Sequence, residues 1–326
     1  MRVLGNRKNL KYLSDAAKSG RLSHAYMICG DKGMGKKTFA ENAAAALLCE
    51  RLSENTGFAP CGRCAACKRS LSGNHPDIIK ITHAKDSVLS ADEIRDQLVN
   101  DIYIKPFYGP YKIYIAADAC LMQPEGLNAI LKTIEEPPAY AVVFLLADNA
   151  DMMPDTVKSR CVRLDMEALS DEIITAQLSA KGADAKEARR TAAYCAGNLG
   201  LALKIYEDKA YGGLIEYISD ILSDIKGKDA AQLFGTAETL SKYETADIPD
   251  MIRRWYRDVL VLKAAKGRRL YFTDKEDVLK EQAVRLSYED INNIFTELDE
   301  AQMRLKFNVN AKAVYETLLL RIRHNG

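Results

Sequence analysis

The sequence lacks an excess of charge of either sign, because 46 Lys and Arg residues nearly balance 45 Asp and Glu residues. A net charge of +1 provides no global positive field, so any contact with DNA has to be local or made within a larger assembly. Long apolar runs are also missing: none approaches the roughly 20 residues that a membrane helix needs. The first ten residues have no apolar core of the kind found in signal peptides. We therefore expect a cytoplasmic protein that does not contact a membrane.

Short apolar segments alternate with helical segments in the first half of the sequence. Strands are predicted at 25–29, 78–82, 111–116, 141–147 and 161–164. Helices are predicted at 38–49, 90–99 and 125–134, and a capping box of Ser90 and Glu93 begins the second of these. The segment 141–147 is apolar throughout, as expected for a central strand of a parallel sheet. The pattern predicts a doubly wound α/β domain.

Beyond residue 164 no further strand is convincing and the sequence becomes helical. Short helices are predicted at 170–181, 185–196 and 199–209, followed by longer ones at 250–263, 287–304 and 310–323. Gly182 and Gly197 mark breaks between the short helices. We therefore expect three domains, namely an α/β domain at 1–165 with an inserted cysteine-rich segment at 49–67, a small helical domain at 166–209, and a helical domain at 210–326.

The segment from Gly30 to Thr38, GDKGMGKKT, departs from a P-loop at one position. Gly30, Gly35 and Lys36 match the pattern G-x-x-x-x-G-K-[ST], but Lys37 occupies the position whose hydroxyl holds Mg²⁺. Thr38 comes one residue late, which turns its side chain by about 100° around the helix. The loop can still cradle phosphates through backbone N–H groups and the Lys36 ammonium. The candidate nucleotide-binding residues are Gly30, Gly33, Gly35, Lys36, Lys37 and Thr38. ATP or ADP could bind there without turnover, or the loop could serve only as scaffold.

Four of the 8 cysteines cluster at Cys49, Cys61, Cys64 and Cys67. In a reducing compartment such cysteines are thiols or metal ligands rather than disulfides. The two C-x-x-C steps present three sulfur atoms, and Cys49 can complete a tetrahedral set for a structural Zn²⁺. His75 is a conceivable substitute ligand. A redox role is the alternative, although no thioredoxin-like context surrounds the motif.

Together these segments resemble the AAA+ subunits of the bacterial clamp loader of DNA polymerase III. The resemblance is carried by HAYMICGDKGMGKKT at 24–38, the cysteine knuckle, NHPDI at 74–78, LNAILKTIEEPP at 127–138 and SRC at 159–161. It is close from residue 21 to about residue 164 and looser beyond. The resemblance implies a RecA-like AAA+ domain carrying a zinc knuckle, followed by a helical lid and a C-terminal helical collar through which subunits assemble.

The resemblance also marks positions at which this chain departs from the ATPases of the family. Lys37 replaces the Ser or Thr that binds Mg²⁺, and Gly200 stands where the ATPases carry the sensor 2 arginine. The Walker B pair Asp-Glu falls on Ala117 and Asp118, so the carboxylate that supports the metal is lost. A shortened side chain at the base position would also lack the reach that proton abstraction needs. The resemblance therefore implies that this chain lacks residues needed to hydrolyse ATP at its own site.

One catalytic motif of the family is intact. The resemblance implies that Ser159, Arg160 and Cys161 form the SRC motif, in which Arg160 is an arginine finger presented to the nucleotide of a neighbouring subunit. Such an arginine can be worth about 10³–10⁵ in rate. This pattern is that of the non-hydrolysing, delta prime-type subunit. We expect little ATPase activity from the isolated chain and expect it to act within the DNA polymerase III holoenzyme. Its implied partners are tau/gamma-type ATPase and delta-type subunits in a hetero-pentamer, together with the sliding clamp and primer–template DNA.

Two other functions are compatible with the residues. The chain could be an active clamp loader ATPase in which Thr38 and Asp118 take over the lost roles. It could also be a stand-alone module that binds zinc and nucleotide, which would be a monomer without affinity for clamp loader subunits. The first has to explain three degraded positions, and the second leaves the SRC motif without a purpose.

Overall fold

The computed structural model describes residues 3–52, 58–82, 90–122, 124–243, 247–264 and 269–325. The chain forms two compact units, one made of Met1–Leu169 with Asn198–Leu201 and the other of Ser170–Gly197 with Ala202–Gly326. The division into domains at 1–165, 166–209 and 210–326 stays a prediction. Residues 53–57 of the predicted cysteine-rich insertion lie outside the described residues.

The first unit is built on one parallel sheet. Its strands are β1 (Ala25–Cys29), β2 (Ile78–Ile81), β3 (Lys112–Ala116), β4 (Ala141–Ala147) and β5 (Val162–Asp165). They lie in the order β2-β3-β4-β1-β5, and every neighbouring pair is parallel. All five strand predictions are confirmed, with ends that differ by at most one residue. Because the strands are parallel, the loops that follow β1, β3 and β4 all emerge at one edge of the sheet, where ligands bind in such folds.

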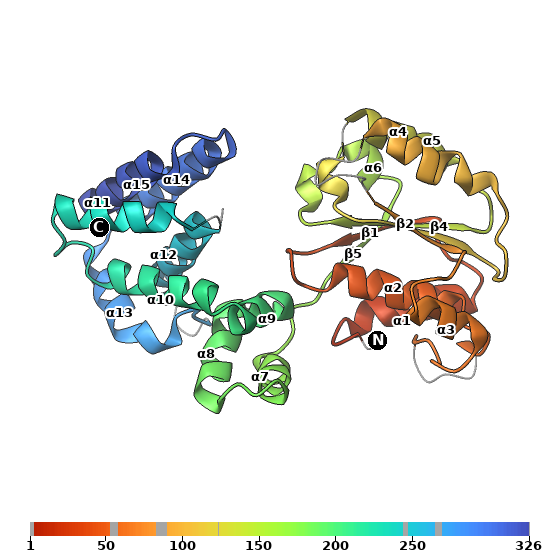
Figure 1. Cartoon of the computed structure of the whole chain (residues 1–326), viewed down its shortest axis with the longest axis horizontal. Coiled ribbons are helices and arrows are strands. Elements are labelled where there is room, and N and C mark those ends of the chain that lie inside the picture. Colours follow the sequence, from red (N-terminus) through yellow and green to blue (C-terminus); the bar gives the residue numbers. More distant parts are fainter. Residues whose placement is uncertain are drawn as a thin grey trace. The chain divides into compact units, whose positions relative to one another are not determined.

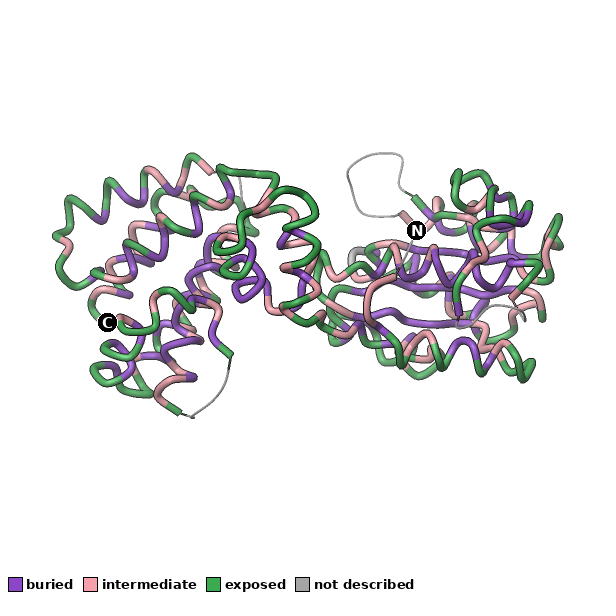
Figure 2. The backbone as a smooth tube through the Cα atoms, turned by 90° about the horizontal axis from the view of Figure 1, so that it is seen from below, coloured by how far each residue is buried: buried purple, intermediate pink, exposed green. Residues whose placement is uncertain are grey.

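Helices cover both faces of this sheet (Figure 1). On one face lie α1 (Arg7–Lys18), α2 (Lys36–Leu47) and α3 (Ala65–Leu71), and on the other lie α4 (Ala91–Ile94), α5 (Pro124–Glu135) and α6 (Asp155–Lys158). Side chains along β1 alternate between the two layers, since Tyr26 and Ile28 pack with Phe39 of α2 while Met27 packs with Ile130 of α5. The central strands are therefore buried along their whole length (Figure 2). This arrangement confirms the doubly wound α/β prediction.

The helix predicted at 90–99 is only partly right. Its capping box is present, because the Ser90 Oγ accepts a hydrogen bond from the Glu93 N–H and the Glu93 carboxylate accepts one from the Ser90 N–H. The α-helical part nevertheless ends at Ile94, and a π-helical turn, η2 (Arg95–Val99), follows. Ile94 and Leu98 are both fully buried in the core. An apolar pattern shows which residues face the core, and it does not distinguish an α-turn from the wider π-turn. Short 3₁₀ turns complete this unit: η3 (Asp101–Tyr103), η4 (Ala119–Leu121) and η5 (Ala150–Met152).

The second unit is helical, as the sequence predicts. Its helices are α7 (Asp171–Ala180), α8 (Ala185–Cys195), α9 (Leu199–Glu207), α10 (Lys209–Ser223), α11 (Ala230–Ser241), α12 (Ile248–Ala264), α13 (Glu276–Arg285), α14 (Tyr288–Lys306) and α15 (Ala311–Asn325), with a 3₁₀ turn η6 (Thr273–Lys275). The first three residues of α9 belong to the first unit. Trp255 is fully buried, and its indole N–H donates to the Gln282 side chain at 2.8 Å. No helix in the described part of the chain combines the length and the apolar character needed to cross a bilayer.

Candidate functional site

The loop between β1 and α2 has the backbone of a P-loop. Gly33 and Gly35 have φ values of +93° and +87°, which residues with a side chain rarely adopt. Gly35 is the residue before α2, and Lys36 is the first residue of that helix. The turn between β1 and α2 thus explains why glycine stands at positions 33 and 35.

The ammonium group of Lys36 is already satisfied by groups of this chain. Its Nζ donates to the backbone oxygens of Gly30 and Asp31 and forms an ion pair of 2.5 Å with the carboxylate of Asp148. The Lys36 side chain is only 10% exposed. Asp148 directly follows β4, and β4 pairs with β1. A carboxylate therefore meets the cation that would contact phosphate in an active P-loop, and sequence reasoning gave Asp148 no role.

The segment Asn198–Leu201 lies against this loop within the first unit. The Asn198 amide donates to the Lys32 backbone oxygen at 2.8 Å, and the Gly200 N–H donates to the Gly33 oxygen at 2.9 Å. A Cβ atom at position 200 would lie 2.5 Å from that oxygen and 2.6 Å from the Gly33 Cα. An arginine at Gly200, where the ATPases of the family carry one, is therefore incompatible with this contact.

The remaining residues predicted for nucleotide chemistry are not assembled into a metal site. Lys37 is exposed, Thr38 and Ala117 are half-buried, and Asp118 is exposed in a left-handed conformation with φ +50°. Across the described residues no hydrogen bond or ion pair joins Asp118 to the P-loop. The Asp148 carboxylate is paired with Lys36, and these residues do not form a set of Mg²⁺ ligands. They therefore do not fit a metal–nucleotide complex.

Arg160 is presented at the surface just before β5. Its guanidinium forms an ion pair of 2.6 Å with Glu135, the last residue of α5, and donates to the Thr156 oxygen and the Ser159 hydroxyl. The Arg160 side chain is 38% exposed. These contacts orient the guanidinium and leave it accessible to another molecule. An exposed ion pair contributes little free energy, so another anion can replace Glu135 at a small cost.

The other two residues of the SRC motif have supporting positions. The Ser159 hydroxyl donates to the Thr156 oxygen at 3.1 Å. Burial and the neighbouring Cys29 raise the pKa of the Cys161 thiol to about 12. The thiol is therefore protonated at neutral pH and is unsuited to act as a nucleophile.

The four clustered cysteines come together in the first unit. The sulfur atoms of Cys49, Cys61, Cys64 and Cys67 all lie within 4.8 Å of one another. Cys64 is the N-cap of α3, and its sulfur accepts the Cys67 N–H at 3.4 Å. The Cys61 sulfur accepts the N–H groups of Cys64 and Arg63, both at 3.4 Å. His75 is not a member of this group.

The arrangement of these sulfur atoms suits a metal, whose binding would release the remaining thiol protons. The backbone N–H groups of Cys64 and Arg63 lower the pKa of Cys61 to about 6, whereas burial raises the pKa of Cys49 and of Cys67. Four sulfurs at this spacing, with N–H groups directed at two of them, fit the closed tetrahedral set of a structural zinc ion. The residues that would hold the ion are the four cysteines, and its contribution would be to join the end of α2 to the start of α3.

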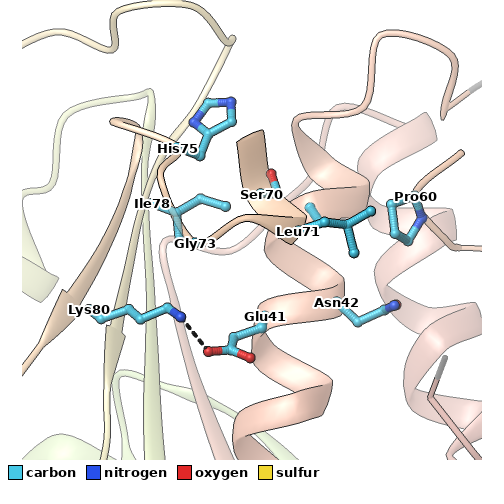
Figure 3. Close-up of a pocket in the computed structure, with 10 residues that line it drawn as sticks. Glu41, Asn42, Pro60, Ser70, Leu71, Gly73, His75, Ile78 and Lys80 are labelled. Atoms are coloured by element: carbon cyan, nitrogen blue, oxygen red, sulfur yellow. Dashed lines mark ion pairs between the residues drawn. The ribbon is translucent and has the colours of Figure 1, made fainter. Parts of the chain in front are cut away.

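A small cavity lies between α2, α3 and β2 (Figure 3). It has a volume of about 90 Å³, and Leu71 and His75 are among the side chains that line it. An ion pair of 2.6 Å between Lys80 and Glu41 closes one side. Ligand pockets usually enclose about 300–1,000 Å³, so this cavity is too small for a nucleotide or a comparable cofactor.

Comparison with known proteins places these features in a family. Residues 5–170 match the family described as DNA polymerase III, delta subunit, and residues 218–324 match the C-terminal part of the same subunit. The delta prime subunit of DNA polymerase III from Bacillus subtilis (strain 168) is 27% identical over 324 residues, which cover 96% of this chain and 95% of that protein. The tau subunit from the same organism is 25% identical over 347 residues.

The tau-type relatives are longer proteins. This chain spans 60% of the B. subtilis tau subunit and 25% of the tau/gamma subunit from Haemophilus influenzae, with which it shares 33% identity over 177 residues. Among solved structures, a gamma subunit-related protein from Thermotoga maritima covers 96% of this chain with 17% identity and a TM-score of 0.45. The delta prime match covers nearly the full length of both chains.

Proposed function

Because the chain belongs to the DNA polymerase III delta subunit family, we propose that it is a delta prime-type subunit of the replicative clamp loader that does not hydrolyse ATP itself. The observation that carries this proposal is how its own P-loop is occupied by other residues of the chain. Asp148 neutralises Lys36, and Gly200 packs directly against Gly33. The chain would hold the assembly in shape and assist a neighbour rather than turn over nucleotide.

The chain's own residues account for the missing turnover in three ways. Nucleotide phosphates would have to displace the Asp148 carboxylate, which repels them. Lys37 offers no hydroxyl to Mg²⁺, and Ala117 offers no carboxylate. ATP or ADP would therefore bind weakly and without hydrolysis.

Arg160 supports the role in trans. Its guanidinium is exposed, and its one carboxylate partner, Glu135, is itself partly exposed. In the assembly it would leave Glu135 for the phosphates of a neighbouring ATPase subunit and stabilise the charge that develops during phosphoryl transfer. ATP turnover by a reconstituted loader carrying Arg160→Ala tests this proposal.

A role in trans requires partner subunits. We propose tau/gamma-type ATPase and delta-type subunits as partners in a hetero-pentamer, with the helices of the second unit serving as lid and collar. Through that assembly the chain would act in the cytoplasm on the sliding clamp and primer–template DNA, as part of the DNA polymerase III holoenzyme. The zinc ion would be structural.

Removing the charge of Asp148 should strengthen nucleotide binding without creating hydrolysis. In the isolated chain, Asp148→Asn is expected to bind a fluorescent ATP analogue about fivefold more tightly, since a partly exposed charge of this kind contributes about 1 kcal/mol. Asp151→Asn, in the exposed turn η5, is the matched control. Unchanged or weaker binding by Asp148→Asn would show that the carboxylate does not guard the loop.

A further inference from the structure

The first unit displays a group of large apolar side chains that the nucleotide site does not use. They belong to the aromatic loop, which we define as residues 103–109, from the last residue of η3 toward β3. Tyr103 is 65% exposed, Ile104 54%, Phe107 78% and Tyr108 65%. Exposed apolar side chains that are clustered, rather than scattered, mark interaction sites.

The aromatic loop is held rigidly at both ends. Asp77 is completely buried, and its carboxylate accepts the backbone N–H groups of residues 107–109 at 2.5–3.1 Å. Near the other end, the buried Lys112 donates from its Nζ to the Ile104 oxygen at 3.2 Å. A buried charge is tolerated only when it is well hydrogen-bonded, so these contacts fix the loop. A ligand that binds it would lose little free energy to ordering the loop.

The surroundings of the aromatic loop carry basic residues, whereas the acidic residues Asp77 and Asp101 beside it are engaged by groups of this chain. Helix α3 reaches the loop through Arg69, whose guanidinium lies 4.2 Å from the centre of the Tyr108 ring. Residues 58–76 and 102–116 contain no Asp or Glu, although the chain as a whole is balanced. Their basic residues are Arg63, Lys68, Arg69, Lys105 and Lys112. Lys112 is paired with Asp101, whereas Lys105 is exposed within the loop. The local charge favours an anionic partner.

Two donors beside the Tyr108 ring lack an acceptor. In the part of the chain that the structure describes, Arg69 Nε and His75 Nε2 are the buried side-chain nitrogens without a hydrogen-bond partner. The His75 Nδ1 accepts the Asp77 N–H at 3.2 Å, so its proton resides on Nε2. His75 is 3% exposed, and its ring lies edge-on to Tyr108 at 6.5 Å. Buried donors ordinarily have an acceptor, so these two nitrogens mark a place beneath Tyr108 where the described chain supplies none.

We propose that the aromatic loop and α3 form a binding surface for single-stranded nucleic acid. Unpaired bases would stack on Tyr103 and Phe107, while phosphates would meet Arg69 and Lys105. Stacking of this kind needs bases that are free of a duplex and tolerates any sequence. A protein is the competing partner, because aromatic residues and arginine are also enriched in protein interfaces, and the test below separates the two. The inference goes beyond the proposed function and does not depend on Arg160.

The test measures binding of a labelled deoxythymidine single strand to the isolated full-length chain by fluorescence anisotropy, without nucleotide. Phe107→Ala is expected to weaken binding about 5- to 150-fold, the range found for loss of one stacking partner. Because Phe107 is exposed, the variant should fold normally. Phe307→Ala, in which an equally exposed phenylalanine outside the loop is removed, should bind as the wild type does. Lys105→Ala should remove about one phosphate contact. The slope of the logarithm of the binding constant against the logarithm of the salt concentration should then become less steep by about 0.7.

Three results would overturn the proposal. The first is wild-type binding to the single strand that is no tighter than binding to a duplex of the same length. The second is equal binding by Phe107→Ala and Phe307→Ala. The third is a loss of assembly with clamp loader subunits in Phe107→Ala while single-strand binding is unchanged, which would make the loop a protein interface. None of these results bears on the arginine finger, whose test is ATP turnover in the assembly.

Discussion

Replacing Arg160 by alanine should slow ATP turnover about 10³–10⁵-fold at the one site that faces this chain in a reconstituted loader. The reason is electrostatic, because negative charge accumulates on the transferred phosphoryl group and a guanidinium stabilises it only if it reaches that group. Arg160 is suited to this by its exposure and by its single carboxylate partner, Glu135. The measurement is DNA-stimulated ATPase with clamp and primed DNA present, with assembly checked by gel filtration.

Two further variants make that result specific. Arg163→Ala removes another exposed arginine, which lies three residues away on β5 and is paired with Asp165, and it should leave turnover unchanged. Arg160→Lys keeps the charge but loses the planar fork that contacts two oxygens, so it should recover only part of the rate. Equal turnover in Arg160→Ala, Arg163→Ala and the wild type would reduce Arg160 to a surface charge.

Loss of one cysteine ligand should remove zinc and destabilise the first unit. The wild type is expected to contain about one zinc per chain, and Cys64→Ser should lose it. The loss of a structural metal belongs among the most destabilising single changes, about 4 kcal/mol or more. For a unit of this size that corresponds to a fall of about 8–16 °C in Tm. Metal analysis and thermal unfolding followed by circular dichroism measure both effects.

Replacing Cys64 by serine distinguishes the effect of losing the metal from the effect of losing the helix cap. Cys64 is the N-cap of α3, and serine is a favoured N-cap, so Cys64→Ser keeps the capping contact while losing the thiolate. Cys120→Ser, outside the cluster, should keep its zinc. The single tryptophan, Trp255, reports on the second unit and should show little change. A wild-type protein without zinc, or a Cys64→Ser variant that retains it, would contradict the zinc assignment.

Local patterns were enough to predict most of the fold. Strands β1 and β4 are short apolar runs bounded by polar or turn residues, so they begin and end where the sequence predicts. Capping residues such as Ser90 likewise predict where a helix begins, since the contact spans only three residues. The cysteine cluster was also predictable, because ligand spacing is itself a local pattern.

The contacts that close the P-loop were not predictable in this way. Lys36 and Asp148 are 112 residues apart, and they meet only because β4 lies next to β1 in the sheet. The contact of Gly200 with Gly33 depends on how a distant helical segment packs. The family resemblance indicates only that Gly200 replaces an arginine. The structure shows in addition that the absence of a side chain at Gly200 allows its contact with Gly33.

The most direct test of the central claim compares Lys36→Ala with Arg160→Ala in this chain, each assembled into the same loader. The account predicts that Lys36→Ala leaves DNA-stimulated ATP turnover within about twofold of the wild type, because the P-loop of this chain does no chemistry. It predicts that Arg160→Ala abolishes turnover at the neighbouring site. A collapse of turnover in Lys36→Ala, with assembly intact and Arg160→Ala fully active, would contradict the account and identify the chain as a working ATPase.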